Sequence, residues 1–368
     1  MAKKNPADFI LIFSVVLLTS IGVIMVFSAS QYSAGIRFND DLHFLKSQLT
    51  WSILGFIVMA ITSKVHYKIF QKYAKVILIF CILLLLAVFI PGLGVNANGA
   101  TRWIGFGPLT IQPSEVTKIG VIIFMADSLC KKKEEIRTFS KGILPYILLV
   151  GFICGLIILQ PNLSTSVVIA VIVFSMLFVA GVNLKYFFTL GIVAMPVLFT
   201  LIFSADYRRR RFTSFLDPWS DMAGDGYQII QSLLAFGSGG LFGQGLGNGK
   251  QKLLYIPEPQ NDFIFAHIGE ELGLIGTATI LLLFMLLIWR GIRIALYAPD
   301  MFASLVASGI VFMIAFQVII NVGVATSMMP VTGMPLPFIS AGGSSLVFLM
   351  GGIGILLNIS RYTVLERS

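Results

Sequence analysis

Long apolar runs alternate with short polar segments along most of the chain. Nine runs each come near the 20 or so residues that an α-helix needs to cross a hydrocarbon core about 30 Å thick. They span 9–28, 47–63, 75–92, 142–160, 164–182, 186–204, 267–289, 302–324 and 343–360. A tenth run, 113–126, is interrupted by charge, and at 1.5 Å per residue it reaches only roughly 21 Å. The pattern predicts an all-α integral membrane protein with about ten transmembrane helices.

The polar segments between these runs divide between two sides of a membrane. Ten crossings would leave both termini on the same side of the membrane. Sixteen of the 26 Lys and Arg residues fall on that side. Nine fall on the other side, and six of these lie in the long loop 205–266 between spans 7 and 8, where the rule that basic loops stay inside is weakest. We therefore expect cytoplasmic termini, an uncleaved first span, and one polytopic domain over 1–368. The segments 92–112, 205–266 and 330–345 are expected outside.

Composition supports the membrane class. Hydrophobic residues make up 57% of the chain and charged residues 12%, whereas soluble proteins carry about 25% charged residues. The net charge of +9 does not indicate nucleic-acid binding, because orientation in a membrane explains basic residues that lie between apolar runs. Cys81, Cys130 and Cys154 show no disulfide framework or metal-ligand spacing and are predicted to be free thiols.

The segment QPSEVTKIG, 112–120, places two charges at the start of the tenth run. Glu115 and Lys118 are spaced i, i+3, so they share a helix face and can pair. An isolated charge at a membrane centre costs about 2.5–3.5 kcal/mol on insertion scales. One interpretation is a self-neutralised pair near the outer interface. The favoured one is a helix that borders an outward-facing polar cavity for an anionic substrate.

The loop 205–266 carries a basic run and a glycine-rich run. Arg208 to Arg211 are consecutive and fit either lipid phosphates or a phosphate-bearing substrate, since Arg pairs with phosphate in a bidentate manner. The segment GSGGLFGQGLGNGK, 237–250, fails as a P-loop, because Gln244 occupies the first glycine position and Gln251 stands where Ser or Thr is required. It is predicted to be a flexible outer loop without a nucleotide site.

Four carboxylates gather where the loop 205–266 meets the next apolar run: Glu258, Asp262, Glu270 and Glu271. Asp262 stands where the chain re-enters the membrane, and partial desolvation there raises the pKa of an acid toward the range useful to a general base. By chemistry alone, Glu258, Asp262 and Glu270 are all acceptable bases. A solvated rim on a membrane helix is the competing interpretation, and periodicity does not rank the candidates.

Five segments together resemble one family. They are NGATRWIGFGPLTIQPSEVTK (98–118), QPNLSTS (160–166), RRFTSFLDPW (210–219), the stretch 224–273 and PVTGMPLPFISAGGSS (330–345). In this order they are similar to the SEDS proteins, in particular to their FtsW and SpoVE branch, over nearly the whole chain. The resemblance implies a ten-span peptidoglycan glycosyltransferase on the outer face of the bacterial cytoplasmic membrane. Such an enzyme polymerises lipid II, with inversion to a β-1,4 bond, for division or sporulation.

The resemblance also implies roles for individual residues. Asp262 matches the family's catalytic acid/base position, and Trp103, Glu115 and Lys118 match positions that are important in relatives. In physical terms, a base takes the proton of the acceptor hydroxyl while positive charge meets the departing pyrophosphate. Candidates for that charge are Lys118, Arg102, Arg210 and, as a cofactor, a divalent cation (Mg²⁺ or Mn²⁺). Glu258 is a further predicted substrate-binding residue.

The implied partners are lipid II, a class B penicillin-binding protein, other divisome or elongasome proteins and membrane lipids. Four residues depart from the family pattern: Asn162 stands where Asp is common, Asn261 where Thr is usual, His267 where an aliphatic residue is usual, and Ala341 where Tyr is usual. A lipid II flippase and a non-catalytic scaffold for a transpeptidase are the alternatives. Polar groups gathered on the outer face favour a polymerase, because a carrier needs an equally polar inner vestibule.

Overall fold

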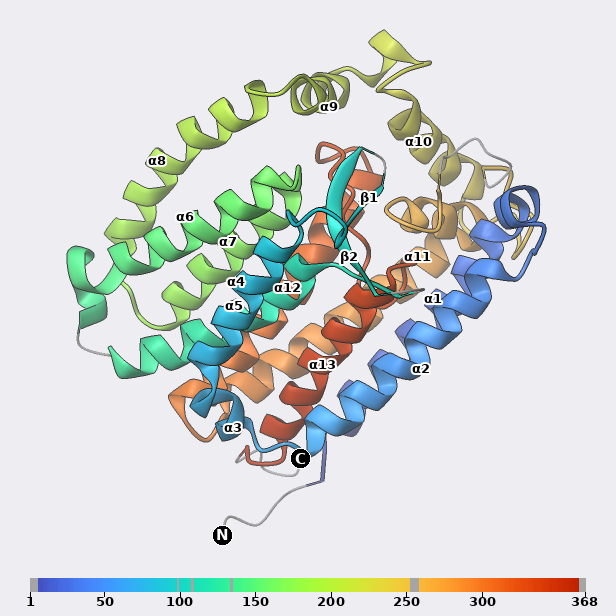
Figure 1. Cartoon of the computed structure of the whole chain (residues 1–368). Coiled ribbons are helices and arrows are strands. Elements are labelled where there is room, and N and C mark those ends of the chain that lie inside the picture. Colours follow the sequence, from blue (N-terminus) through green and yellow to red (C-terminus); the bar gives the residue numbers. More distant parts are fainter. Residues whose placement is uncertain (1–5, 98, 107–108, 133–134, 252–257, 364–368) are drawn as a thin grey trace.

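The chain forms a bundle of helices, with a small sheet and two shorter helices toward one end. A computed structural model describes residues 6–97, 99–106, 109–132, 135–251 and 258–363 (Figure 1). Its helices are α1 (Phe9–Phe38), α2 (His43–Lys64), α3 (Tyr67–Lys72), α4 (Ala74–Ala87), α5 (Pro113–Lys131), α6 (Leu144–Leu159), α7 (Leu163–Val179), α8 (Leu184–Phe203), α9 (Asp206–Leu216), α10 (Tyr227–Gly239), α11 (Ile264–Leu296), α12 (Met301–Ala325) and α13 (Gly343–Ser360). The start of α1 and the end of α13 meet, because the Asp8 amide donates to Ser360 Oγ over 3.3 Å.

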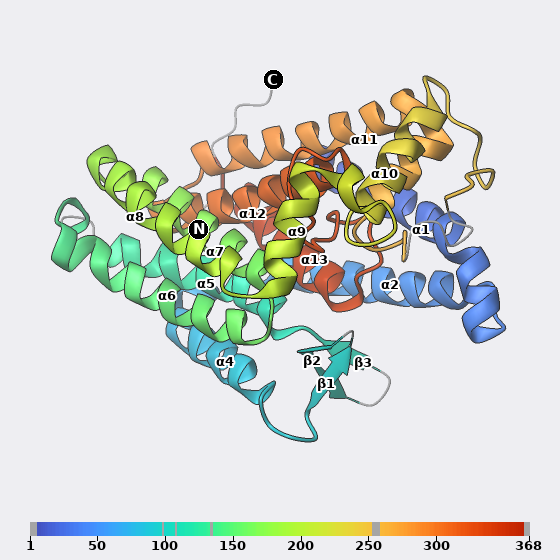
Figure 2. The same ribbon diagram turned by 90° about the horizontal axis from the view of Figure 1, so that it is seen from above.

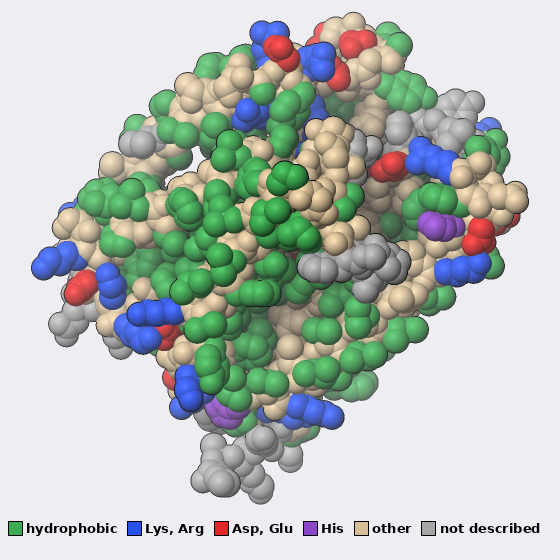
Figure 3. Space-filling model, viewed as in Figure 1, with side chains coloured by type: hydrophobic (Ala, Val, Ile, Leu, Met, Phe, Trp, Pro, Cys, Tyr) green, Lys and Arg blue, Asp and Glu red, His purple; other side chains and the backbone are tan. Residues whose placement is uncertain are grey.

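Seven helices in the described part of the chain are long and apolar enough to cross a membrane: α1, α2, the helix Phe139–Leu159, α8, α11, α12 and α13. Two shorter apolar helices, α4 and α7, accompany them. Each of the ten predicted runs falls on a helix. Apolar side chains cover the middle of the face drawn in Figure 3, and charged side chains gather toward its edges. The chain is therefore a mostly helical, multi-pass membrane protein.

The helix over the tenth run is longer than the sequence indicated. Pro113 occupies the first turn of α5 as predicted, but the helix continues to Lys131 and contains 19 residues, or roughly 28 Å. Asp127 ended the apolar pattern in the sequence. In the structure its carboxylate accepts a hydrogen bond from Lys131 Nζ at 2.6 Å, one turn further on. This i, i+4 pair allows the helix to carry a charge, so the expectation of a short span is wrong.

Glycines set the closest contacts between helices. Where α13 packs against α2, a Cβ on Gly354 would overlap the Met59 carbonyl oxygen, and a Cβ on Gly55 would overlap the Met350 sulfur. Small residues let helix backbones approach closely in a membrane, where packing replaces the hydrophobic effect as the driving force. The central helix α12 packs against α5, α7, α11 and α13, and Figure 2 shows it between α11 and α5. The helix α8 runs along the outer edge of the bundle (Figure 1).

A three-stranded antiparallel sheet corrects the all-α expectation. It consists of β1 (Gly94–Ala97), β2 (Ala100–Phe106) and β3 (Leu109–Ile111) in the order β1-β2-β3. The sequence indicated only an irregular segment here, because its glycines and asparagines obscured the strand formers of ATRWIGF. Gly99, with φ +75°, lies between β1 and β2 where the chain reverses. The sheet carries Trp103, which pairs with Val95.

The loop 205–266 is also more ordered than predicted. It contains α9 and α10, and the glycine-rich run after α10 is not a flexible loop in its described part. α11 is broken at Gly273, where φ is +65°, and the loop occupies the break. Leu274 and Ile275 amides donate to the carbonyls of Gly240 and Leu241 at 2.9 and 3.2 Å. Gln244 and Gly245 amides donate in return to the carbonyls of Glu270 and Glu271 at 2.9 and 3.0 Å.

Because the loop packs this closely against the broken helix α11, substitutions at two glycines of α10 are expected to differ in their effect on stability. A Cβ on Gly239 would overlap the Gly269 carbonyl oxygen, whereas a Cβ on Gly237 meets nothing within 4 Å. Gly239→Ala is expected to lower the free energy of unfolding by about 1–3 kcal/mol, as overpacked sites do. Gly237→Ala is expected to leave stability unchanged or to raise it by about 0.5–1 kcal/mol. Thermal unfolding of both variants in detergent measures the difference, and equal melting temperatures would contradict the packing described.

Candidate active site

Asp262 lies two residues before α11 begins, and a side chain of α12 fixes its backbone. Asn321 Nδ2 donates to the Asp262 carbonyl oxygen and to the Met334 carbonyl oxygen, both at 2.8 Å. Asn321 is 1% exposed, so this double contact is shielded from water and holds its geometry firmly. One buried amide therefore ties the candidate base to the segment 330–342. The sequence pattern did not single out Asn321, because a lone amide in an apolar run carries no signal.

The surroundings of Asp262 suit a base. Its side chain is half-buried, and burial raises the pKa of the carboxyl above its usual range. Its own backbone amide and the charge of Arg211 lower the pKa in part, and the charge of Glu258 raises it further. A base whose pKa is moved toward neutrality accepts a proton more readily in a transition state. The partial burial of Asp262 is consistent with the desolvation predicted for this position.

A cavity of about 280 Å³ lies near this carboxyl, although Asp262 itself is not among the lining residues, and Arg211 in its wall is close enough to lower the pKa of Asp262. A methyl group on Gly333 would lie 3.9 Å from Asp262 Oδ2, and the preceding residues Val331 and Thr332 line the cavity. Its polar wall includes the following side chains from β2, the start of α7 and α9: Arg102, Asn162, Ser164, Tyr207, Arg208 and Arg211. Its apolar wall includes Leu198 and Ile202 of α8 and Ile320 of α12. The cavity is amphipathic, with three guanidinium groups and a flank of aliphatic side chains.

The start of α7 shapes the polar wall. Asn162 caps this helix, since its Oδ1 accepts from the Thr165 amide at 3.2 Å. Arg102 reaches across from β2 and donates to the carbonyl oxygens of Gln160, at 3.2 Å, and of Pro161. An Asp at position 162 would cap the helix equally well, so the departure from the family pattern keeps the local structure.

Of the four consecutive arginines, two face the cavity and one faces away. Arg208 and Arg211 line it, whereas Arg210 pairs with Asp225 at 3.3 Å and is largely exposed. Helix geometry explains this division, because positions 207, 208 and 211 share one face of α9. The basic run alone indicated Arg210, because the helix α9 is not apparent from four consecutive arginines. If 206–216 is taken as a helix, positions 207, 208 and 211 lie on one face, and this pattern points to Arg211 instead.

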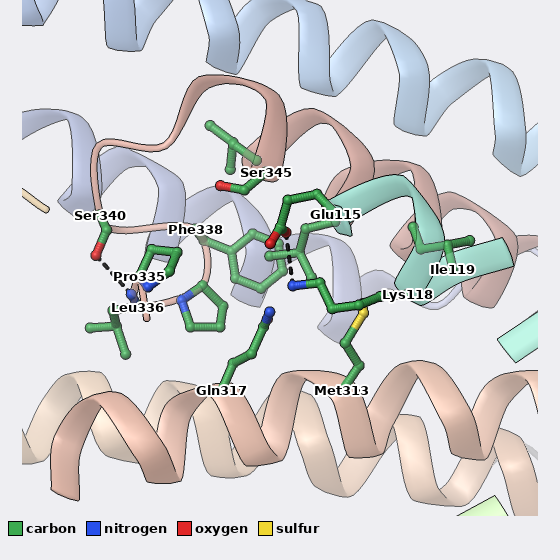
Figure 4. A pocket seen from close by; sticks show the side chains of 13 residues that line it. Glu115, Lys118, Ile119, Met313, Gln317, Pro335, Leu336, Phe338, Ser340 and Ser345 are labelled. Carbon is green, nitrogen blue, oxygen red and sulfur yellow. Dashed lines mark hydrogen bonds and ion pairs between the residues drawn. The ribbon is translucent and has the colours of Figure 1, made fainter. Parts of the chain in front are cut away.

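Glu115 and Lys118 pair as their spacing predicts, but they do not line the large cavity. Lys118 Nζ lies 2.8 Å from Glu115 Oε2, and the two side chains are 1% and 7% exposed. They lie in a separate pocket of about 20 Å³, which Gln317 of α12 and the segment Pro335–Phe338 help to enclose (Figure 4). That volume holds about one water molecule. In this arrangement both charged side chains are almost completely shielded from solvent.

The remaining predicted residues are distributed around the site. Trp103 is half-buried on β2, next to Arg102. Glu258 accepts a hydrogen bond from Asn261 Nδ2 at 2.8 Å and pairs with Arg37 at 3.4 Å, both near solvent. Glu270 and Glu271 are 1% and 0% exposed, so the interpretation of these two as a solvated rim is wrong.

In the part of the chain that the structure describes, Cys81, Cys130 and Cys154 form no disulfide, as predicted. Across the described ranges, no three His, Cys, Asp or Glu side chains form a group that could hold a metal ion. Glu258 is close enough to Asp262 to raise the pKa of its carboxyl, and two carboxylates are a set that Mg²⁺ accepts together with substrate phosphates. A divalent cation therefore stays a prediction.

Fold and site together define a multi-pass membrane protein with an arginine-lined, amphipathic cavity beside a desolvated carboxylate. The family model described as "Cell cycle protein", for FtsW, RodA and SpoVE, matches residues 9–365. The chain belongs to this family.

Similar proteins cover almost the whole chain. Stage V sporulation protein E of Bacillus subtilis is 47% identical over 98% of this chain and 99% of its own. The probable peptidoglycan glycosyltransferase FtsW of Geobacter sulfurreducens is 45% identical over 96% of this chain and 95% of its own.

Solved structures show the same fold. A chain from a study of structural coordination of polymerization and crosslinking by a peptidoglycan synthase complex aligns with a TM-score of 0.80. It is 30% identical and covers 96% of this chain and 98% of its own. The rod shape determining protein RodA of Thermus thermophilus aligns with a TM-score of 0.72, at 28% identity and 98% coverage of both chains.

Proposed function

We propose that this protein is a peptidoglycan glycosyltransferase that joins lipid II disaccharide units into β-1,4 glycan strands for cell division or sporulation. The observation that carries the proposal is the half-buried Asp262 carboxyl beside the arginine-lined cavity. The names of the FtsW and SpoVE relatives, at 45% and 47% identity over nearly their full lengths, support the same activity.

Asp262 acts as the general base in this proposal. The donor sugar is α-linked to a lipid pyrophosphate and the product bond is β, so a single in-line displacement inverts the anomeric carbon. Asp262 removes the proton of the acceptor hydroxyl as its oxygen attacks that carbon. The bond to the pyrophosphate oxygen breaks, and undecaprenyl diphosphate leaves. Because pyrophosphate departs without protonation, the second carboxylate of a glycosidase pair is not needed.

The cavity fits the donor's leaving group. Arg208 and Arg211 offer donors to a pyrophosphate, and Arg102, whose Nε and Nη2 bind the carbonyls of Gln160 and Pro161, adds a third positive charge. Leu198 and Ile202 of α8 provide an apolar surface for the first part of the lipid chain. Trp103, on the strand that carries Arg102, offers a flat apolar face to a sugar. Positive charge placed where the pyrophosphate departs stabilises the developing anion.

Lys118 has a second, separate role in the proposal. Its ammonium group assists the pyrophosphate, and Glu115 orients it. The segment Pro335–Phe338 closes the small pocket that the pair lines, so Lys118 reaches a substrate only when this segment moves. A divalent cation bound with the substrate is the alternative source of this charge.

The proposal includes the position of the protein in the bacterial cytoplasmic membrane. Ten spans, made by the seven long helices with α4, α5 and α7, leave both termini in the cytoplasm and α9, α10 and the sheet outside. The solved peptidoglycan synthase complex supports a transpeptidase partner, a class B penicillin-binding protein, within a larger division or elongation assembly. Lipid II and membrane lipids are the remaining ligands.

The test of the proposed function uses the purified chain, alone and with its partner transpeptidase, incubated with fluorescent lipid II. We expect strands longer than one disaccharide that a muramidase digests. A scaffold would yield no strands in either mixture although the complex forms, and that result would reject the proposal.

Arg211, which lines the cavity, and Arg210, which faces away from it, provide a matched pair of substitutions. Arg211→Ala removes a donor from the cavity wall and is expected to raise the KM for lipid II about 10-fold or more, as the loss of a hydrogen bond to a charged group does. Arg210→Ala breaks an exposed pair with Asp225 and is expected to change KM by less than about 3-fold. Steady-state polymerisation kinetics of both variants decide between them, and a larger effect at Arg210 would contradict the cavity assignment.

A further inference from the structure

The start of α11 buries a cluster that the proposed reaction does not use. His267, Glu270 and Glu271 are each 0 or 1% exposed. Two carboxylates inside an apolar bundle are strongly destabilising unless hydrogen bonds and opposite charge satisfy them. The hydrogen-bond partners of Glu270 and Glu271 therefore show which parts of the chain the cluster holds in place.

Glu270 binds the backbone of the segment before Asp262. Its Oε1 accepts from the Lys250 amide at 2.8 Å, and its Oε2 accepts from the Gln251 amide at 3.2 Å. Gly249 permits this approach, because a Cβ there would come within 2.8 Å of Glu270 Oε2. A carboxylate that accepts two adjacent backbone amides forms short, charge-assisted hydrogen bonds.

Glu271 joins the same segment to α1. It accepts from Ser28 Oγ at 2.6 Å and from the Gly249 amide at 3.4 Å. The His267 ring lies between the two carboxylates, with Nε2 3.3 Å from Glu271 Oε1 and Nδ1 3.9 Å from Glu270 Oε2. The cluster thus connects α1, α11 and the chain at 249–251.

The contacts lie close to Asp262 along α11. Glu270 and Glu271 are on this helix, which begins at Ile264, two residues after Asp262. Their contacts with 249–251 and with Ser28 of α1 fix the start of α11, and so restrict the residues that directly precede it. Asn321 then holds the Asp262 backbone from the opposite side.

We propose that Glu270 and Glu271, with His267 between them, are positioning residues that clamp the start of α11 against 249–251 and α1 and so set the place of the general base. The inference rests on the proposed function and deepens it. The clamp does not touch the substrate; it acts through the start of α11, which Asp262 precedes by two residues. Near-attack geometry is sensitive to displacements of about 1 Å, which makes such a clamp matter for the rate.

The test compares Glu270→Ala, which removes both acceptor oxygens, with Glu270→Gln, which keeps one. Thr277→Val is the control, because Thr277 is buried on the same helix but its hydroxyl bonds only to the carbonyls of Gly273 and Leu274, at 3.2 and 3.0 Å. Hydrogen exchange of peptides covering 247–263 is measured for all three and for the native chain. We expect exchange roughly 10-fold faster in Glu270→Ala, as after the loss of hydrogen bonds, and near-native exchange in the other two. Native exchange in Glu270→Ala would overturn the clamp.

The pH dependence of polymerisation distinguishes positioning from a loss of folded protein. Releasing the clamp hydrates Asp262, so the acidic limb of the kcat profile is expected to move to lower pH in Glu270→Ala. We expect kcat to fall on the order of 10-fold to 100-fold, as misplaced catalytic groups do. A profile scaled down equally at every pH would show a structural role only and would reject the inference. Absence of strands from the native chain would instead reject the proposed function, while the exchange result would stand separately.

Discussion

Replacing Asp262 with Asn is expected to lower the rate of lipid II polymerisation on the order of 10²-fold to 10⁴-fold, which is the contribution typical of a general base. The amide retains the size and polarity of the side chain but cannot accept the proton of the acceptor hydroxyl. Asn321 contacts the backbone of Asp262 rather than its carboxyl, so the fold around the site is expected to survive. Rates are measured at saturating lipid II, with binding measured separately.

Glu258→Gln is the matched control for that result. Glu258 lies four residues away, but its contacts with Asn261 and Arg37 are near solvent. We expect its loss to change the rate by less than about 3-fold, as for an exposed ion pair. A large loss at Glu258 together with full activity of Asp262→Asn would move the base to Glu258. Full activity of both Asp262→Asn and Glu258→Gln would reject both carboxylates as the general base.

The second large effect is expected at Lys118. Lys118→Met removes the cation that neutralises Glu115 inside the bundle. A broken buried pair leaves an uncompensated charge, so the free energy of unfolding is expected to fall by about 3–5 kcal/mol. Thermal or denaturant unfolding in detergent measures the loss.

The double variant Glu115→Gln/Lys118→Met separates stability from chemistry. It removes both charges, and we expect it to recover most of the lost stability. Its polymerase activity is expected to stay low, because the proposed function uses the Lys118 charge at the pyrophosphate. Full activity in this stable variant would show that the pair serves packing alone.

The sequence predicted those features of the fold and the site that depend on residues near one another in the chain. Apolar runs marked the helices, since each run can bury its backbone polar groups only by forming a helix in a membrane. The i, i+3 spacing marked the pair of Glu115 and Lys118, and the re-entry point marked the desolvated Asp262. Each of these features depends on residues within one or two turns.

Features that depend on distant contacts were missed or misread. The glycine-rich run 237–250 has the composition of a flexible loop, yet it is ordered by the break in α11 at Gly273, more than 20 residues away. Asn321 and Glu270 gain their meaning from backbone groups elsewhere in the chain. Arg211 was hidden among four arginines, because only the helix α9 assigns each of them a direction.

The flippase alternative differs from a polymerase in what it does to lipid II. The described cavity has arginines and an apolar flank next to one carboxylate, and this set suits a departing pyrophosphate as well as a transported head group. Chemistry at Asp262 distinguishes the two, since transport changes no covalent bond.

The most direct measurement follows both processes in one preparation. The native chain and its partner transpeptidase are reconstituted into liposomes that contain fluorescent lipid II, and muramidase-sensitive strands and transfer of lipid II between leaflets are recorded together. The account predicts strands from the native chain, none above background from Asp262→Asn, and no transfer beyond that of empty liposomes. Transfer by the native chain and by Asp262→Asn alike, with no strands from either, would contradict it.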